Sequence, residues 1–194
     1  MKLNFSFLNW LKKYKMPKNI QYFIFSFVFF IACKSDKIVI KNPTVFFQEL
    51  IADDKNAIFK NINFDFSKDD VIDAEKSQQY DATESYLAYS YNFPKDTSKF
   101  VEYADIKYFF DEHDVLKIIT VNVYLNDSIQ ETQLLDNFKE YYSHKYDAPK
   151  IDEYQYYSWD ATADSKTTKG KYYFNIGIRK LAGEYGLALE FLRL

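Results

Sequence analysis

The chain beyond residue 86 is organised around one long helical pattern with strand-like segments on both sides of it. A helix is predicted to begin at Ser128 and to end before Pro149, with apolar side chains every three or four residues. On each side of it lie three short runs rich in Val, Ile, Phe and Tyr, which favour strands. The predicted strands span 86–91, 104–110, 115–125, 154–161, 171–180 and 187–192. Because the connections are short, we expect an antiparallel sheet with helices packed on one face, which is an α+β fold.

An additional helix is predicted ahead of these elements. Asn42 followed by Pro43 is a typical helix start, since the asparagine side chain can cap the helix and proline suits its first turn. The apolar residues that follow keep helical spacing, which predicts a helix over 43–59.

Two capping-box patterns mark further helix starts. Ser67 and Asp70 can satisfy each other's free backbone donors, which predicts a short helix over 68–77. The long helix is expected to begin in the same way, with Ser128 and Glu131 as the pair. The predicted order is therefore helix, helix, three strands, helix and three strands.

This order contains a repeat. One helix-plus-three-strand block starts at Ser67 and the next starts about 60 residues later at Ser128, so residues 67–126 and 127–194 are candidate structural repeats with little sequence identity. The order is similar to that of small envelope lipoproteins of the SmpA/OmlA type and to the beta-lactamase inhibitor protein architecture. No diagnostic motif accompanies the resemblance, so it implies a tandem-repeat fold and no particular partner.

Residues 1–32 have the organisation of an export signal. Lysines precede an apolar run from Ile20 to Ala32, and about 13 residues is the length of a signal-peptide apolar region. A membrane-spanning helix needs roughly 18 or more apolar residues, so a cleaved signal is the favoured interpretation. Met16 is an alternative initiator, because a start there leaves a more compact signal.

The apolar run ends in Phe30-Ile31-Ala32-Cys33, which resembles the lipobox of bacterial lipoproteins. The resemblance implies that Cys33 receives diacylglycerol and that the chain is cut before it. Phe30 departs from the usual leucine, whereas the small residue and the cysteine match. Cys33 is the single cysteine of the chain, so no disulfide can form within it.

The same resemblance divides the chain into three parts. Residues 1–32 are the expected signal peptide, 33–41 a lipidated tether, and 42–194 a single α+β domain. Lys34 stands where an aspartate would retain some lipoproteins in the inner membrane, so we expect a bacterial envelope protein of the outer membrane. The protein would bind the membrane through the lipid anchor on Cys33, since two or more acyl chains give durable anchoring.

The charge of the mature part is strongly acidic. Residues 1–32 carry five of the 25 basic residues and no acid, which leaves 20 basic against 28 acidic residues. Such a balance repels phosphate backbones, so we predict no nucleic-acid binding. An acidic domain is better suited to a basic partner.

No combination of residues indicates catalysis. The run Asp111–Asp114 is the best metal candidate, but four consecutive residues on a tight turn cannot all face one ion. The sequence has no serine in a Gly-flanked elbow for which His113 or His144 would act as the general base. No phosphate-binding loop or dinucleotide fingerprint occurs. We therefore predict a non-enzyme without cofactor or metal, with a hydrolase built on an unrecognised carboxylate pair as an alternative.

Aromatic residues on the predicted strands are the most distinctive feature of the mature part. Because strand neighbours point to opposite faces, adjacent rings such as Tyr156 and Tyr157 must lie on both sides of the sheet. On an open face they would give rigid contact area for a protein or a glycan, whereas rings that only cover the core would have no such role. The residues are Tyr86, Tyr89, Tyr91, Tyr103, Tyr108, Tyr154, Tyr156, Tyr157, Tyr172, Tyr173 and Trp159.

These features favour a membrane-anchored envelope lipoprotein with a non-catalytic binding or assembly role and a protein partner. Changing Tyr156, Tyr157 and Trp159 to Ala is predicted to abolish partner binding. The alternative from another class is an inhibitor or immunity protein that blocks a basic enzyme.

Overall fold

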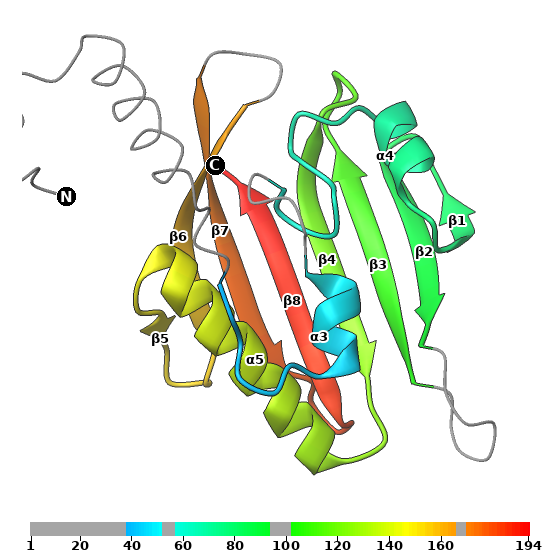
Figure 1. Cartoon of the computed structure of the whole chain (residues 1–194). Coiled ribbons are helices and arrows are strands. Elements are labelled where there is room, and N and C mark those ends of the chain that lie inside the picture. The colour runs from blue at the N-terminus through cyan, green and yellow to red at the C-terminus, as the bar shows by residue number, and fades with distance from the viewer. Residues whose placement is uncertain (1–37, 52–56, 94–101, 166–169) are drawn as a thin grey trace, which may run out of the picture. The chain divides into compact units, whose positions relative to one another are not determined.

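A single sheet of eight antiparallel strands forms the framework of the protein (Figure 1). The computed structural model describes residues 38–51, 57–93, 102–165 and 170–194. The predicted signal peptide, Cys33 and the first part of the tether lie outside these residues. The strands are ordered β1-β2-β3-β4-β8-β7-β6-β5. They are β1 (Gln78–Ala82), β2 (Tyr86–Asn92), β3 (Tyr103–Phe110), β4 (Leu116–Tyr124), β5 (Lys150–Ile151), β6 (Tyr157–Asp164), β7 (Lys171–Lys180) and β8 (Gly186–Arg193).

The strand order divides the sheet into two halves of four strands. In each half the strands follow one another from an outer edge to the middle, where β4 and β8 pair in antiparallel register. The six predicted strands are confirmed, but the expectation of three strands per block is wrong. β1 and β5 were missed because the five residues of β1 are all exposed and β5 has only two residues, so neither shows a buried alternation.

Three helices accompany the sheet: α3 (Val45–Leu50), α4 (Lys68–Ala74) and α5 (Ser128–Tyr146). Figure 1 shows α3 and α5 in front of the same face of the sheet. The Phe47 ring of α3 contacts the rings of Phe138 and Tyr141 on α5, at centroid distances of 5.2 and 5.7 Å. The capping box of α4 is confirmed, because Ser67 and Asp70 satisfy each other's backbone N–H groups.

The helix expected over 43–59 is shorter than predicted. Thr44, and not Asn42, caps α3, because its side chain accepts a hydrogen bond from the Phe47 backbone N–H. Residues 57–59 are not helical, and Phe59 forms an isolated bridge with Ile62. Pairing with Ile62 thus replaces the expected helix at Phe59, and residues 52–56 of the predicted helix lie outside the described residues.

The capping box expected at the start of α5 is also wrong. Asp127 is the cap, because its carboxylate accepts hydrogen bonds from two backbone N–H groups of the first turn. Glu131 turns away from Ser128 and instead accepts hydrogen bonds from the Lys180 ammonium and from the Gly186 backbone N–H. Glu131 therefore ties α5 to the ends of β7 and β8.

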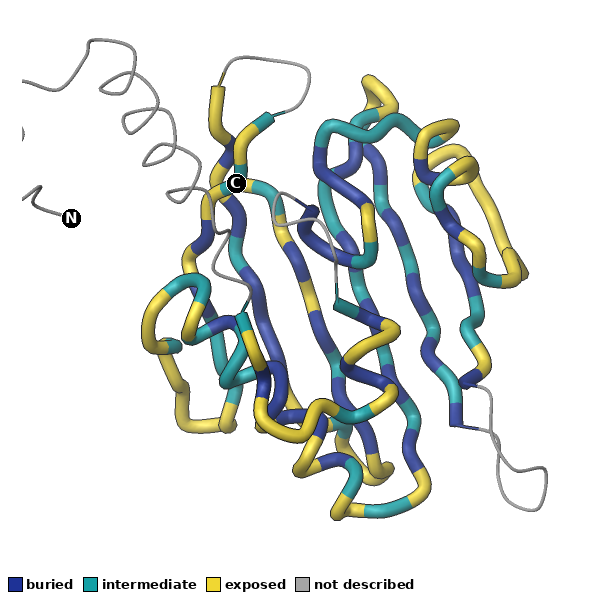
Figure 2. The backbone as a smooth tube through the Cα atoms, in the orientation of Figure 1, coloured by how far each residue is buried: buried dark blue, intermediate teal, exposed yellow. Residues whose placement is uncertain are grey.

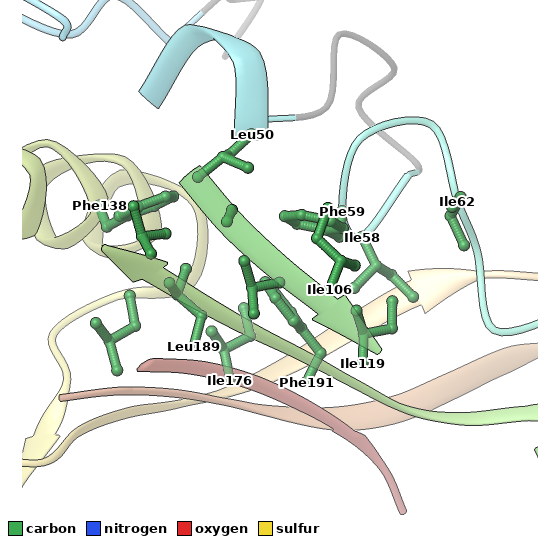
Figure 3. Packing of buried hydrophobic residues seen from close by; sticks show 14 of the residues in the cluster. Leu50, Ile58, Phe59, Ile62, Ile106, Ile119, Phe138, Ile176, Leu189 and Phe191 are labelled. Atoms are coloured by element: carbon green, nitrogen blue, oxygen red, sulfur yellow. The ribbon is translucent and has the colours of Figure 1, made fainter. Parts of the chain in front are cut away.

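The hydrophobic core lies between the sheet and the helices. Figure 2 shows buried positions alternating with less buried ones along the central strands. Ile106 and Phe191 of the sheet gather beneath Leu50 of α3, Phe138 of α5 and Phe59 of the α3–α4 segment (Figure 3). None of the five is more than 1% exposed. One face of the sheet therefore packs on the core.

Candidate binding surface on the open face of the sheet

The strand register assigns each side chain of the sheet to one of two faces. Directly paired residues share a face, and successive residues on a strand alternate between faces. The helix-covered face is buried at its centre, where Ile106, Val121, Leu189 and Ile178 pair across β3, β4, β8 and β7. On the opposite face no helix of the described part of the chain packs, and we refer to it as the open face.

Aromatic and apolar side chains form two rows across the open face. The first, the apolar row, comprises Tyr86, Phe109, Ile118 and Leu192, which pair across β2, β3, β4 and β8. The second is formed by Tyr103 and Tyr124, which pair on β3 and β4. Polar residues such as Asp105 separate the rows. The open face is therefore an aromatic surface, and the residues of its two rows are half-buried or exposed.

Three tyrosines and one acid gather at one end of this face. The rings of Tyr103 and Tyr124 are stacked, with centroids 4.6 Å apart and planes inclined by 19°. Tyr80 lies at the bulge of β1, is 51% exposed and is within electrostatic reach of Tyr103 and Asp105. Burial and the charge of Asp105 raise the pKa of all three tyrosines. Their hydroxyls therefore stay protonated at neutral pH and remain available as donors.

Asp105 differs from the other carboxylates of the sheet. It is half-buried between the two rows, and desolvation raises its pKa against the opposing effect of Lys107. Among the residues that the structure describes, its carboxylate accepts no hydrogen bond and forms no ion pair. The Lys107 ammonium instead lies 6.0 Å from the centroid of the Tyr86 ring. Asp105 is thus a desolvated negative charge without a bonded partner in this part of the chain.

The residues that the sequence singled out for binding are only partly on this surface. Trp159 is 1% exposed and packs against Tyr142 of α5, so it belongs to the core and not to the open face. Tyr157 lies on the helix-covered face, where it pairs with Ile178. Tyr156 precedes β6 and extends over Gly177 on the open face, with its hydroxyl in the place that a Cβ would take.

Other rings follow the same division. Tyr89, Tyr108 and Tyr172 are buried against the core, and only Tyr173 and Tyr154 among the predicted rings are more than half exposed. Tyr154 lies in the turn before β6 and not on a strand. The correct face of each ring follows from register, which the sequence alone did not provide.

Several residues of the open face were missed at the sequence level. Phe109 and Tyr124 lie in predicted strands, and their alternation with the buried Phe110 and Val123 was the available signal. Tyr80 had no such signal, because β1 lacks a hydrophobic pattern.

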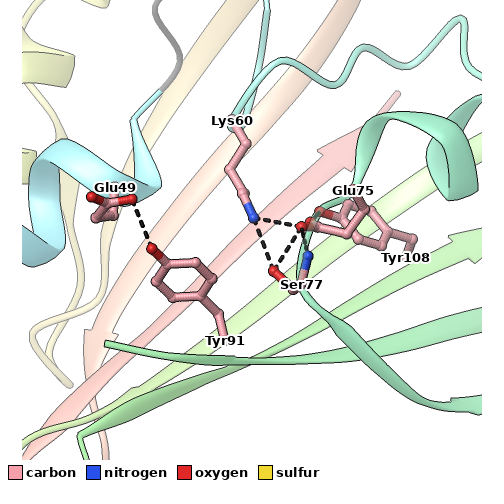
Figure 4. Close-up of polar contacts among 6 residues, drawn as sticks. All are labelled: Glu49, Lys60, Glu75, Ser77, Tyr91 and Tyr108. Carbon is pink, nitrogen blue, oxygen red and sulfur yellow. Dashed lines mark hydrogen bonds and ion pairs between the residues drawn. The ribbon is translucent and has the colours of Figure 1, made fainter. Parts of the chain in front are cut away.

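A second cluster of polar residues lies on the covered side, around Glu75 (Figure 4). Its carboxylate accepts hydrogen bonds from the Lys60 ammonium at 2.5 Å, the Ser77 hydroxyl at 2.7 Å and the Tyr108 hydroxyl at 2.6 Å. Burial by itself would raise the pKa of Glu75, but Lys60, Tyr108 and Ser77 together lower it. The carboxylate is therefore charged at neutral pH and fully paired, as a structural group would be.

The cluster extends towards α3. The Lys60 ammonium lies 5.1 Å from the centroid of the Tyr91 ring, and the Tyr91 hydroxyl donates to Glu49 at 2.7 Å. Burial and this hydrogen bond raise the pKa of Tyr91 to about 12. The contacts connect α3, the segment after it and the sheet, so we interpret them as a structural clamp.

The structure places the acidic turn and His144 on separate elements, the β3–β4 connection and α5. Asp111 accepts hydrogen bonds from the backbone N–H groups of Val115 and His113 and forms an ion pair with Lys117 at 3.1 Å, and together these lower its pKa to about 2. His144 lies on α5 beside a shallow hollow that Ser143 also lines. Within the described ranges, no group of three or more His, Cys, Asp and Glu residues is placed to hold a metal ion.

Comparison of the chain with known protein families, curated proteins and solved structures gives no match. No helix in the described part of the chain has both the length and the apolar character needed to cross a membrane. The open face is therefore interpreted from its own chemistry.

Proposed function

We propose that this protein is a lipid-anchored, non-catalytic protein of the bacterial cell envelope, and that it binds a protein partner through the open face. The single observation that carries the binding role is a sheet face on which no helix of the described residues packs and which carries two rows of aromatic and apolar side chains. Aromatic side chains of this kind are enriched where proteins associate. The anchor is Cys33, for which the support is the lipobox-like sequence around it.

We further propose that the two halves of the domain are structural repeats. The support is the strand order, in which each half runs from an edge to the centre. Each repeat then contains one helix and four strands, α4 with β1–β4 and α5 with β5–β8. The open face extends across both repeats, so a partner could contact both at once.

An inhibitor or immunity protein is the second candidate function. The observation that favours it is the excess of acidic residues after position 32, which suits a basic target enzyme. In this case expression of the protein would rescue cells from a co-expressed basic toxin, and variants of the open face would lose the rescue.

The anchor is tested by changing Cys33 to Ser in the full chain and fractionating the cells. The lipoprotein proposal expects the protein to move from the membrane fraction to the soluble one. An unchanged distribution would contradict the anchor, and it would leave the binding role to its own test.

The binding role is tested by site-specific photocrosslinking in the native envelope. A photoreactive residue is placed at Phe109 or Leu192 on the open face, and at Ile129 of α5 as a control, because Ile129 is 68% exposed on the helix-covered side. The proposal expects one defined crosslinked protein from the two open-face positions and none from Ile129. Equal labelling at all three positions, or no defined product, would refute it.

A further inference from the structure

We infer that Tyr80, Tyr103, Tyr124 and Asp105 form a recognition site for a lysine or arginine side chain of a basic protein partner. This inference rests on the proposed binding role of the open face and specifies what that face recognises. It is carried by the geometry of the rings, by a carboxylate that has no bonded partner among the described residues, and by the surrounding charge.

The rings supply aromatic faces for a cation. Tyr103 and Tyr124 stack across the central strands β3 and β4, so their position is set by the sheet backbone and not by a loop. Tyr80 approaches from the edge strand β1 and remains half exposed. A cation above tyrosine rings is attracted by their negative faces, and the attraction grows when the site is partly desolvated.

The carboxylate supplies the charge that such a cation would neutralise. Asp105 is half-buried beside the rings, and within the described residues it forms no hydrogen bond or ion pair, while Lys107 acts on it only at longer range. A desolvated charge is costly without a partner. The nearest basic residue on the strand, Lys107, has its ammonium over the Tyr86 ring. An incoming ammonium or guanidinium group would therefore contact rings and carboxylate together.

The surroundings favour a protein as the source of the cation. Asp81 and Glu184 add negative charge within electrostatic reach of the tyrosines, and acidic residues exceed basic ones by eight after position 32. The site continues along the same face to the apolar row, which offers contact area beyond a single charged group. A basic protein surface would use the charge at one end of the open face and the apolar row at the other.

The experiment uses the ¹⁵N-labelled full chain in a nonionic maltoside detergent, which carries no ammonium group of its own. The probes are a short peptide of alternating glycine and arginine and the same peptide with neutral citrulline in place of arginine. We expect the arginine peptide to shift the amide signals of Tyr80, Tyr103, Asp105 and Tyr124 in a saturable way, and the citrulline peptide to leave them unchanged.

Two variants and three controls identify the groups that bind. Tyr103→Leu and Asp105→Asn should each lower the affinity for the arginine peptide by roughly 3- to 10-fold. Tyr103→Phe, which keeps the ring, should bind nearly as well as the unchanged protein. Glu112→Gln, which removes an exposed acid elsewhere, and Tyr173→Leu, which removes an exposed ring, should have no effect.

The outcomes separate this site from the wider proposal. Equal weakening by Asp105→Asn and Glu112→Gln, or equal binding of the citrulline peptide, would overturn the cation site. Binding of free choline with the same saturation, and none of the arginine peptide, would overturn it in favour of a lipid headgroup. Crosslinking from Phe109 and Leu192 does not depend on the four residues, so its success beside such a result would leave the binding role standing.

Discussion

Replacing Lys60 by Met tests whether the cluster around Glu75 is a structural clamp. The Glu75 side chain is fully buried and that of Lys60 is 18% exposed, with 2.5 Å between the ammonium and the carboxylate. Removing one partner of a buried ion pair typically costs 3–5 kcal/mol, because the other charge remains buried and unpaired. Lys60 keeps some contact with water, so we expect a loss near the lower end, about 3 kcal/mol of the free energy of unfolding.

The pH dependence of this loss is a second part of the prediction. In the unchanged protein the folded-state pKa of Glu75 lies below its usual 4.5, so its contribution to stability is present above that value and disappears as the pH falls through the folded pKa. Without Lys60, burial is opposed only by the hydrogen bonds from Tyr108 and Ser77, so we expect the pKa of Glu75 to be higher in the variant than in the unchanged protein. As the pH falls, the variant therefore gains stability relative to the unchanged protein, and the difference between their free energies of unfolding becomes smaller.

The assay is urea unfolding of the full chain, followed by circular dichroism at pH 7 and at several lower values. The double variant Lys60→Met with Glu75→Gln should regain most of the loss, because no charge is then left buried. Lys150→Met is the matched control, since Lys150 and Asp160 are also 2.5 Å apart but both exposed, and its effect should be several times smaller. Equal losses for the two lysine variants, or a pH-independent difference, would refute the reasoning.

Three further predictions concern single positions. Asp127→Ala should lower the free energy of unfolding by about 1 kcal/mol, because Asp127 is the cap of α5, whereas Ser128→Ala should have little effect. Denaturant titration measures both variants, and a larger loss for Ser128→Ala would contradict the assignment of the cap. Gly186→Ala should cost roughly 1–3 kcal/mol, because the new Cβ would lie 1.9 Å from the Val123 carbonyl oxygen, and an unchanged thermal midpoint would contradict this. Trp159→Ala should cost about 3–5 kcal/mol through loss of core packing; a stable variant that lost only partner binding would show that Trp159 belongs to the interface after all.

Local features of the sequence predicted most of the secondary structure. The strand β7 lies at its predicted limits, 171–180, because a run of alternating side chains bounded by polar residues is informative without any tertiary contact. The capping box at Ser67 is equally local, since both hydrogen bonds join residues three positions apart. The interpretation of Cys33 as a lipid anchor also depends on neighbouring residues alone, and it remains a prediction.

Features that depend on distant residues were decided by the tertiary structure. The sequence contains Glu131 at a capping distance from Ser128, but the folded chain places Lys180 and Gly186 beside it, and it bonds to them instead. β1 is stabilised by its pairing with β2 and not by a pattern of its own.

The candidate site required the register of the whole sheet. Sequence alternation alone shows that Tyr156 and Tyr157 face opposite ways, and it does not show which ring meets the helices. The pairing of β3 with β4 brings Tyr103 against Tyr124, and the bulge in β1 allows Tyr80 to join them. A shift of register by one residue would move each of these rings to the other face. The sequence therefore showed that the strands are rich in aromatic residues, and only the tertiary structure decided which of them form a common surface.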